Sequence, residues 1–431
     1  MGAYIILTAV VAELAFAVFC VETRSHQAKA RNMLRIAAFA SFVLLVALRV
    51  IYWSLRYYAL GLLLGLLAAI GTINLLRKVS YLQPYRLRRI VLQAVGTTVL
   101  IAVVTLPAVI FPQHQGLAMT GEHQVATVNY TYTDSTRVET YSDAGTNRKV
   151  TVGLWFPQVD RGKYPLIVFS HGGFGIKTSN ETLYKELASH GYVVCAIDHT
   201  YQCLYTTDVD GHVTLLDRGY MQECNEEDAR ADRQQSFAYY QQWMGVRTGD
   251  ISFVIDRILA EAVQPGADAA YRLVDAQRIG VMGHSLGGAA ALGIGRMRDD
   301  VDAVMALDAP FLCDIVGVEN GEFVFVQDTY PAPVLNIYSD DAWGLLSDRP
   351  QYEANYRLLS DAAATAHNVR ISGAGHFSLT DLALSTPALT RLLDQVPSPA
   401  DATYCLTTIN RVTLAFFDCY LKGRGEFSPE K

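Results

Sequence analysis

Residues 278–295 read RIGVMGHSLGGAAALGIG: a short apolar run, a glycine-rich turn around Ser285, and an alanine-rich run. The first run has the length and composition of a buried strand, and the second is typical of a helix. Gly283, Ser285 and Gly287 form the pattern G-x-S-x-G between them, where small residues allow a strained turn that exposes a serine hydroxyl. This stretch predicts a nucleophilic serine on a turn between a strand and a helix.

The sequence around this turn predicts an α/β architecture. Further strand-like runs lie at 125–132, 150–156, 166–170, 192–197, 301–307, 333–338 and 368–373. Helical stretches are expected at 179–190, 226–262, 285–296, 351–366 and 404–421. Strands alternating with helices indicate a mainly parallel sheet covered on both sides. The segment 201–224, with its turn-forming Asp210–Gly211 pair, is expected to form a hairpin or lid.

A serine nucleophile needs a general base, and few histidines are available for that role. Only His367 and His376 follow Ser285, and the base follows the nucleophile in folds with this strand–serine–helix turn. His376 lies in the loop GAGHF directly after the last expected strand, whereas His367 precedes that strand. We therefore expect His376 to be the general base.

The acid that orients the base has several candidates. Asp308 follows the run 301–307, and Asp340 and Asp341 follow the run 333–338. The carboxyl ends of parallel strands meet at one edge of a sheet, so each of these carboxylates can reach the imidazole. The residue pattern alone leaves the choice open.

An oxyanion needs backbone donors, and the segment SHGGFG at 170–175 can supply one. It follows the strand-like run 166–170, so the N–H of Gly173 or Phe174 can point at the site. The N–H of Leu286, directly after the nucleophile, is the expected second donor.

These motifs together resemble the platelet-activating factor acetylhydrolase and dienelactone hydrolase-like branch of the α/β-hydrolases. The resemblance extends from about Val150 to about Gly423. It is carried by YPLIVFSHGGFG (164–175), LASHGYVVCAIDH (187–199), RIGVMGHSLGG (278–288), AVMALDAP (303–310), the GHF loop (375–377) and RVTLAFFDCYLKG (411–423).

This resemblance implies an α/β-hydrolase fold for the catalytic domain, 125–431. It implies a carboxylic ester hydrolase that uses no cofactor and favours esters with short or oxidised, lipid-like acyl chains. It also implies that Asp308 is the acid and that Gly173 and Leu286 are the oxyanion donors.

Other functions remain alternatives to an acetylhydrolase-like esterase. A general carboxylesterase, a lipase or a polyester hydrolase would use the same catalytic residues. A non-catalytic membrane receptor on a hydrolase fold is disfavoured, because such a protein need not keep Ser285, His376 and the HGG segment. A net charge of −7 with no basic stripe argues against a nucleic-acid partner. No Cys/His cluster has zinc-like spacing, so no metal is expected.

The N-terminal part is expected to be a membrane anchor. The chain is 51% hydrophobic and 18% charged, and the apolar residues are concentrated in the first 111 positions. Four stretches there, 3–21, 36–55, 57–76 and 90–111, approach the roughly 20 residues that cross a bilayer. The second is the weakest, because Arg49 interrupts it. We expect a transmembrane bundle at 1–111 and a linker at 112–124, with no removable signal peptide, since the start MGAY lacks a basic region.

Positive charge predicts the orientation of this bundle. Nine Lys/Arg residues follow the first and third apolar stretches, and only Arg49 and Arg56 follow the second. Loops rich in Lys and Arg lie on the cytoplasmic side. Four spans then place the catalytic domain outside the cytoplasm.

Two further features allow alternative interpretations. Glu13 lies inside the first stretch and can pair with Arg49 or line a polar path, although a role in helix association alone is favoured. Cys203 and Cys224 flank the polar segment 201–224 and could form a disulfide outside the cell, with free buried cysteines as the simpler interpretation.

Overall fold

A computed structural model describes residues 1–77, 85–114, 116–159, 161–359, 366–394, 396 and 399–428 of the chain. Contacts within the chain separate two compact units. One includes Met1–Gln115, and the other includes Gly116–Leu384 and Thr390–Lys431.

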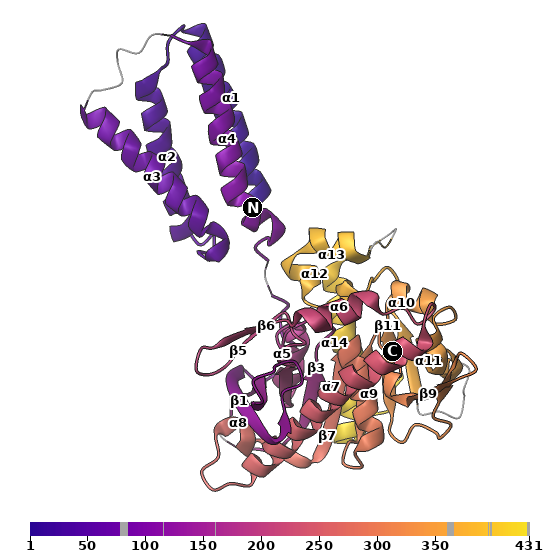
Figure 1. Ribbon diagram of the computed structural model, residues 1–431. Helices are drawn as coiled ribbons and strands as arrows, with labels where there is room; N and C mark the ends of the chain where they lie inside the picture. Colours follow the sequence, from indigo (N-terminus) through magenta and orange to yellow (C-terminus); the bar gives the residue numbers. More distant parts are fainter. Residues whose placement is uncertain are drawn as a thin grey trace. The chain divides into compact units, whose positions relative to one another are not determined.

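The first unit is built from four long helices. They are α1 (Gly2–Glu22), α2 (Ala28–Ala47), α3 (Leu55–Arg77) and α4 (Leu87–Ile110). Helix α1 packs against α4, α2 packs against α3, and α3 also contacts α4 (Figure 1). In the described part of the chain, these four helices are long and apolar enough to cross a membrane.

The expected bounds of the second helix were wrong in detail. Helix α2 begins at Ala28 rather than at residue 36 and ends at Ala47, so Arg49 lies in the following turn, with a φ of 56°. Arg49 therefore does not interrupt the second helix. Glu13 forms its ion pair with Arg31 (Oε2–Nη1 3.3 Å), and both side chains are buried. This contact between α1 and α2 takes the place of the alternative pair with Arg49 and agrees with the favoured role of Glu13 in helix association.

The second unit is built on an eight-stranded sheet. In spatial order its strands are β1 (Val125–Val138), β2 (Asn147–Pro157), β4 (Val193–Asp198), β3 (Tyr164–Ser170), β7 (Val274–His284), β8 (Ala303–Leu307), β11 (Val334–Tyr338) and β12 (Ala366–Arg370). Strand β2 runs antiparallel to β1 and β4, and every pairing from β4 to β12 is parallel. The central strands are buried on both faces, as parallel strands usually are. The predicted mainly parallel sheet is confirmed.

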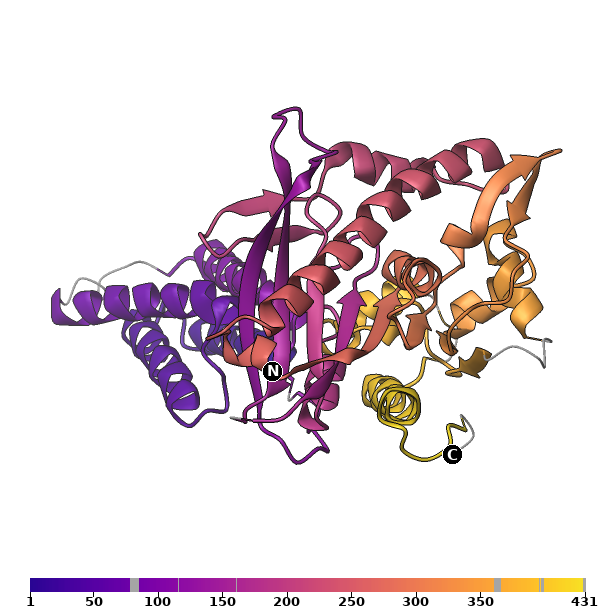
Figure 2. The ribbon, with the colours of Figure 1, turned by 90° about the horizontal axis from the view of Figure 1, so that it is seen from below.

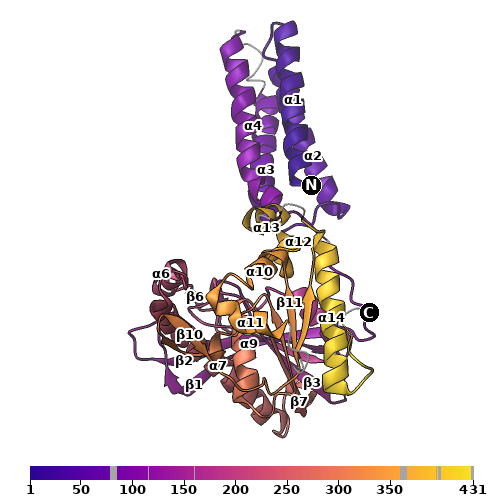
Figure 3. The same ribbon diagram turned by 90° about the vertical axis from the view of Figure 1, so that its right-hand side faces the viewer.

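Helices cover both faces of this sheet. One face carries α5 (Glu181–Ser189) and α14 (Ala402–Lys422), and the other carries α7 (Arg233–Ala262), α8 (Ala269–Arg272) and α9 (Leu286–Met297). Figure 3 shows α14 and α9 on opposite sides of the strands. The long helix α7 runs across the sheet and contacts β3 and β7 (Figure 2). This layered arrangement brings the carboxyl ends of the parallel strands to one edge.

The remaining described elements are short. Two hairpins are formed by β5 (Tyr205–Thr207) with β6 (Val213–Leu215) and by β9 (Ile315–Glu319) with β10 (Glu322–Phe325). The short helices are α6 (Arg218–Glu226), α10 (Asp340–Leu345), α11 (Glu353–Leu358), α12 (Leu382–Ser385) and α13 (Pro387–Asp394). Three 3₁₀ turns lie at Leu312–Asp314, Pro350–Tyr352 and Phe377–Leu379. The segment 201–224 does contain a hairpin, β5–β6, as expected. The helix expected at 351–366 is shorter, and positions 360–365 lie outside the described residues.

Candidate active site

Ser285 lies on a sharp turn between β7 and α9. Its backbone has φ 54° and ψ −126°, a conformation that residues other than glycine rarely adopt. The N–H of Ser285 donates to the carbonyl of Leu307 in the neighbouring strand β8 (2.8 Å). Strain of this kind costs about 1–3 kcal/mol and persists only where the surrounding structure imposes it.

The glycines around Ser285 allow the turn because no side chain would fit there. A Cβ atom on Gly283 would lie 2.3 Å from the backbone of Gly287, and one on Gly287 would lie 2.1 Å from the carbonyl oxygen of Ser170. A Cβ atom on Gly288 would lie 2.6 Å from Cβ of Ala309. The pattern G-x-S-x-G-G thus reports close packing of helix α9 against two strands.

His376 and Asp308, two residues expected to act together, form a direct contact. Nδ1 of His376 lies 3.1 Å from Oδ2 of Asp308. Asp308 is 1% exposed and accepts from the backbone N–H (2.6 Å) and the hydroxyl (2.5 Å) of Ser339. The carboxylate is therefore fixed between the ends of β8 and β11. An Nδ1–H that donates to Asp308 leaves Nε2 of the imidazole free to act as a base.

The loop that carries His376 is held by two further acids. Asp394 accepts from the backbone N–H groups of Phe377 (2.6 Å) and Ser378 (3.0 Å). Asp341 accepts from the backbone N–H of His376 (3.2 Å). Burial lowers the pKa of His376, but the hydrogen bond and charge of Asp308, with the charges of Asp394 and Asp341, leave that pKa above its ordinary value of 6.5.

The imidazole of His376 lies beside the serine turn but is not bonded to it. The rings of His376 and His284 have centroids 4.5 Å apart, and His284 directly precedes Ser285. The Ser285 hydroxyl makes no hydrogen bond to any residue that the structure describes. Bonds between a nucleophile and its base are often long without substrate and shorten when substrate binds.

Asp340, the competing acid, is engaged elsewhere. It pairs with Nε of Arg370 (2.7 Å) and accepts from the N–H of Gly373 (2.8 Å). Among the described contacts it makes none with His376.

The HGG segment lies directly against the serine turn. A Cβ atom on Gly172 would lie 3.4 Å from Cβ of Ser285, and one on Gly173 would lie 3.4 Å from Cδ1 of Leu286. Within the described residues, the N–H of Gly173 has no hydrogen-bond acceptor. The two expected donors, on Gly173 and Leu286, therefore belong to segments that meet beside the serine.

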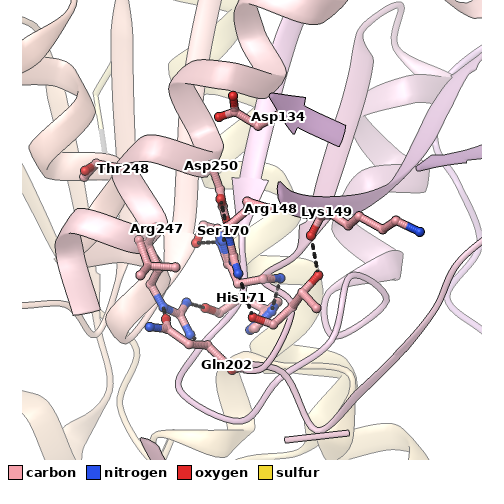
Figure 4. A network of polar contacts seen from close by, with 12 residues as sticks. Asp134, Arg148, Lys149, Ser170, His171, Gln202, Arg247, Thr248 and Asp250 are labelled. Atoms are coloured by element: carbon pink, nitrogen blue, oxygen red, sulfur yellow. Dashed lines mark hydrogen bonds and ion pairs between the residues drawn. The ribbon is translucent and has the colours of Figure 1, made fainter. Parts of the chain in front are cut away.

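Sequence reasoning missed a buried polar network behind the HGG segment (Figure 4). Ser170 and His199 are in contact (Oγ–Nε2 2.8 Å), and Nδ1 of His199 lies 2.9 Å from Asp250. Asp250 also pairs with Arg148 (2.6 Å) and Arg137 (2.8 Å). Burial lowers the pKa of His199 to about 4, against the opposing effect of Asp250, so this imidazole is neutral near pH 7.

A signal for this network was present in the expected helix 226–262. Arg247 and Asp250 occupy the apolar stripe of α7 that includes Trp243, Ile251 and Val254, and all five are buried. Charged residues at buried helix positions indicate internal partners.

Among the described residues, the cysteines and two other polar clusters lie outside the Ser285 turn. All seven cysteines are free, so Cys203 and Cys224 form no disulfide.

The ligand atoms of His171, Asp198 and Cys203 lie close together, but Asp198 is already paired with Lys177 (2.6 Å). A second group, Asp208, Asp210 and His212, lies on the β5–β6 turn, where Asp208 accepts from backbone N–H groups.

Comparison with protein families gives a match over most of the second unit. Residues 115–243 and 267–429 match the model of the family described as platelet-activating factor acetylhydrolase, isoform II. The match does not include residues 1–114.

Individual relatives are more distant. Platelet-activating factor acetylhydrolase of Cavia porcellus is 23% identical over 277 residues, which cover 60% of this chain and 58% of that protein. The Bos taurus protein of the same name is 23% identical over 298 residues, covering 64% and 62%. Cutinase est2 of Thermobifida alba is 29% identical over 154 residues, covering 36% and 37%. The chain thus spans less than two thirds of the length of these relatives.

A solved structure shows the same fold. The ferulic acid esterase of Streptomyces cinnamoneus superposes with a TM-score of 0.55 at 23% identity, covering 72% of this chain and 93% of that one. The second unit therefore has the α/β-hydrolase fold that its motifs imply.

Proposed function

Because this chain belongs to the platelet-activating factor acetylhydrolase isoform II family, we propose that it is a serine esterase that hydrolyses carboxylic esters through an acyl-enzyme. The observation that carries this proposal is the strained turn of Ser285 beside the His376–Asp308 pair. A positive φ at a serine is costly, and such strain is concentrated at functional sites.

In the proposed acylation step, Oγ of Ser285 attacks the carbonyl carbon of the ester, and its proton passes to Nε2 of His376. The carbonyl oxygen becomes an oxyanion that accepts from the N–H groups of Gly173 and Leu286. Collapse of this intermediate expels the alcohol, which takes the proton from Nε2. The acyl group remains on Ser285.

Deacylation reverses the roles of the same groups. A water molecule transfers a proton to Nε2 of His376 and attacks the acyl carbon, which again generates an oxyanion. The carboxylic acid then leaves, and Oγ of Ser285 regains its proton from Nε2. In both steps Asp308 holds the imidazole in one tautomer and stabilises the imidazolium.

The proposed substrates are esters with short or oxidised acyl chains on lipid-like molecules. The acetylhydrolases among the relatives support a short acyl group. The β5–β6 hairpin supports an apolar remainder, because Tyr205 and Leu215 lie opposite each other on it and are 45% and 66% exposed. The N–H of Leu204, next to this hairpin, donates to Gly175 at the end of the HGG segment (3.3 Å). The relative named a cutinase favours a broader ester or polyester hydrolase as the alternative.

The first unit is proposed to embed the protein in a membrane. Large apolar side chains face outward along its helices, among them Leu14 (60% exposed), Leu62 (66%) and Leu92 (60%). Rows of such side chains are unfavourable in water and favourable in a bilayer. The distribution of Lys and Arg supports a multi-pass topology with the catalytic domain outside the cytoplasm.

The proposal is tested with the full chain in detergent micelles or nanodiscs. Wild-type protein is treated with a fluorophosphonate and then assayed on a series of esters of increasing acyl length. Ser285→Ala is expected to lose both labelling and hydrolysis. Ser170→Ala is the matched control, because Ser170 also contacts a histidine that is paired with an acid but is fully buried.

Wild-type protein that neither labels nor hydrolyses any ester would rule out the esterase. Labelling that disappears in Ser170→Ala but persists in Ser285→Ala would place the nucleophile elsewhere. If the wild-type protein is active, a hydrolysis rate that rises with acyl-chain length would favour a lipase-like enzyme over an acetylhydrolase-like one.

A further inference from the structure

Arg247 is a fully buried arginine on α7. Its relative exposure is 0%, and within the described part of the chain it forms no ion pair. Its Nε donates to the side-chain carbonyl of Gln202 (2.8 Å). Burying an unpaired charge is expensive, so stability alone gives no reason for an arginine at this position.

The guanidinium instead donates to consecutive carbonyls of the HGG segment. Nη1 lies 2.5 Å from the carbonyl oxygen of His171, and Nη2 lies 3.3 Å from that of Gly172 and 3.5 Å from that of Gly173. The planar fork of arginine presents several donors in fixed directions, which suits a row of carbonyls. Figure 4 shows Arg247 with Gln202 and His171 in this network.

Holding a carbonyl also orients the N–H of the same peptide unit. The carbonyl of Gly172 and the N–H of Gly173 share one planar unit, and in a trans peptide they point in opposite directions. The chain has no cis peptide bond among its described residues. Because the carbonyl of Gly172 is turned towards Arg247, the N–H of Gly173 is turned away from Arg247. Ser285 lies close to this peptide, since a Cβ atom built on Gly172 would lie 3.4 Å from Cβ of Ser285.

Two neutral groups contact the carbonyls of Gly172 and Gly173 at shorter distances than Arg247 does, but without its charge. Nδ1 of His171 lies 2.6 Å from the carbonyl oxygen of Gly172, and its Nε2 accepts from the N–H of His199 (3.3 Å). Burial, together with the nearby charge of Arg247, keeps the pKa of His171 well below 6.5, so its ring is neutral. The hydroxyl of Tyr220 donates to the carbonyl of Gly173 (3.0 Å).

We propose that Arg247 is a positioning residue of the oxyanion hole, which fixes the Gly172–Gly173 peptide so that the N–H of Gly173 faces the oxyanion. This inference rests on the proposed esterase function. The guanidinium also polarises the peptide units that it contacts, and this strengthens the N–H donors at their other ends. The effect is largest when the oxyanion carries full charge, so Arg247 contributes mainly to the transition state.

The experiment uses the full chain with four substitutions. Arg247→Met removes the charge and the donors, and Arg247→Lys keeps the charge but loses the fork. Arg148→Met and Arg148→Lys are the matched controls, because Arg148 is equally buried in the same network but donates to Asp250, Glu139 and Thr200 and not to the HGG segment. Active sites are counted with a fluorophosphonate, so that rates refer to folded protein.

The readouts are kcat, KM and the Ki of a trifluoromethyl ketone, in which Ser285 adds to the carbonyl and produces an oxyanion. Arg247→Met is expected to lower kcat about tenfold to hundredfold, less than the hundredfold to thousandfold caused by removing a donor outright. Its KM should change less than about threefold, and Ki should rise by the same factor as kcat/KM falls. Arg247→Lys is expected to lie between Arg247→Met and wild type.

A purely structural role for Arg247 would lower the count of active sites and leave kcat per site and Ki unchanged, which would overturn the proposal. Equal losses of kcat per site in the Arg148 variants would also overturn it. If neither Arg247 variant folds, Gln202→Met, which removes the acceptor of Nε, should lower kcat per site about threefold to tenfold, and an unchanged value would count against the proposal. A wild-type protein without esterase activity would instead remove the proposed function itself.

Discussion

The carboxylate of Asp308 lies 3.1 Å from Nδ1 of His376, although the two residues are 68 positions apart in the chain. The contact forms because β8 and β11 are parallel neighbours whose carboxyl ends lie at the edge where the His376 loop returns. We expect Asp308→Asn to lower kcat by a factor on the order of 10⁴, as the equivalent change does in a serine protease. Asp340→Asn should lower kcat less than about tenfold, because Asp340 is bound to Arg370 and Gly373 rather than to His376. Steady-state kinetics of the two variants decides between the acids, and reversed results would transfer the role to Asp340.

The activity should fall on the acidic side with an apparent pKa above 6.5. In the proposed mechanism only neutral His376 accepts the proton of Ser285, and the environment of this histidine raises its pKa above that value. The reactive form is therefore lost as the pH falls through the raised pKa. A pH profile of kcat/KM on a soluble ester measures it. Asp308→Asn should shift the acidic limb to lower pH, since Asp308 is the main group that raises this pKa; an acidic limb that stays in place would contradict the assignment.

The buried network should make the catalytic domain lose stability in mild acid. His199 has a pKa of about 4 in the folded chain, below its ordinary value of 6.5, so the unfolded chain binds the proton first as the pH falls. Its contribution to stability is complete above about pH 6.5 and is lost as the pH falls through about 4. The free energy of unfolding is measured in urea across this pH window, and its slope against pH gives the number of protons taken up on unfolding. The His199→Gln variant should be less stable at pH 7 but should take up about one proton fewer on unfolding. A slope against pH equal to that of the wild type would show that His199 does not titrate as inferred.

The catalytic domain should be accessible from outside the cytoplasm. Nine Lys/Arg residues follow the first and third apolar stretches and two follow the second, a bias that sets membrane orientation. Protease added to intact cells is expected to remove the domain and leave the four-helix unit. A cytoplasmic reporter protein serves as the control for leakage. Cleavage that occurs only after the membrane is opened would show that the catalytic domain lies on the cytoplasmic side.

The sequence predicted well those positions in the fold that depend on local pattern. The glycines around Ser285 fix a turn within a few positions, and alternating strands and helices imply a parallel sheet, so the order of the chain places Asp308 and His376 at one edge. The position of His376 relative to the Ser285 hydroxyl is not encoded in any local pattern, and the two are not bonded in the structure.

Contacts between distant elements were predicted poorly. The partner of Glu13 is Arg31 rather than Arg49, because the pairing depends on where α2 begins and on how it is rotated against α1. The apolar pattern places the start of α2 too late, since its first turns contain Lys29 and Arg31. Arg247 was missed for a related reason. Its partners lie in the segment after β3, in the segment after β4 and in α6, and no spacing along the chain links them.

A search for serine, imidazole and carboxylate by distance alone would select a group of residues in this chain other than the proposed catalytic one. Ser170, His199 and Asp250 form an unbroken chain of contacts of 2.8 and 2.9 Å, whereas Ser285 is not bonded to His376. All three members of that chain are sealed from solvent, so no ester can reach the hydroxyl. Backbone strain and partial exposure, rather than a complete hydrogen-bond relay, therefore support Ser285 as the proposed nucleophile.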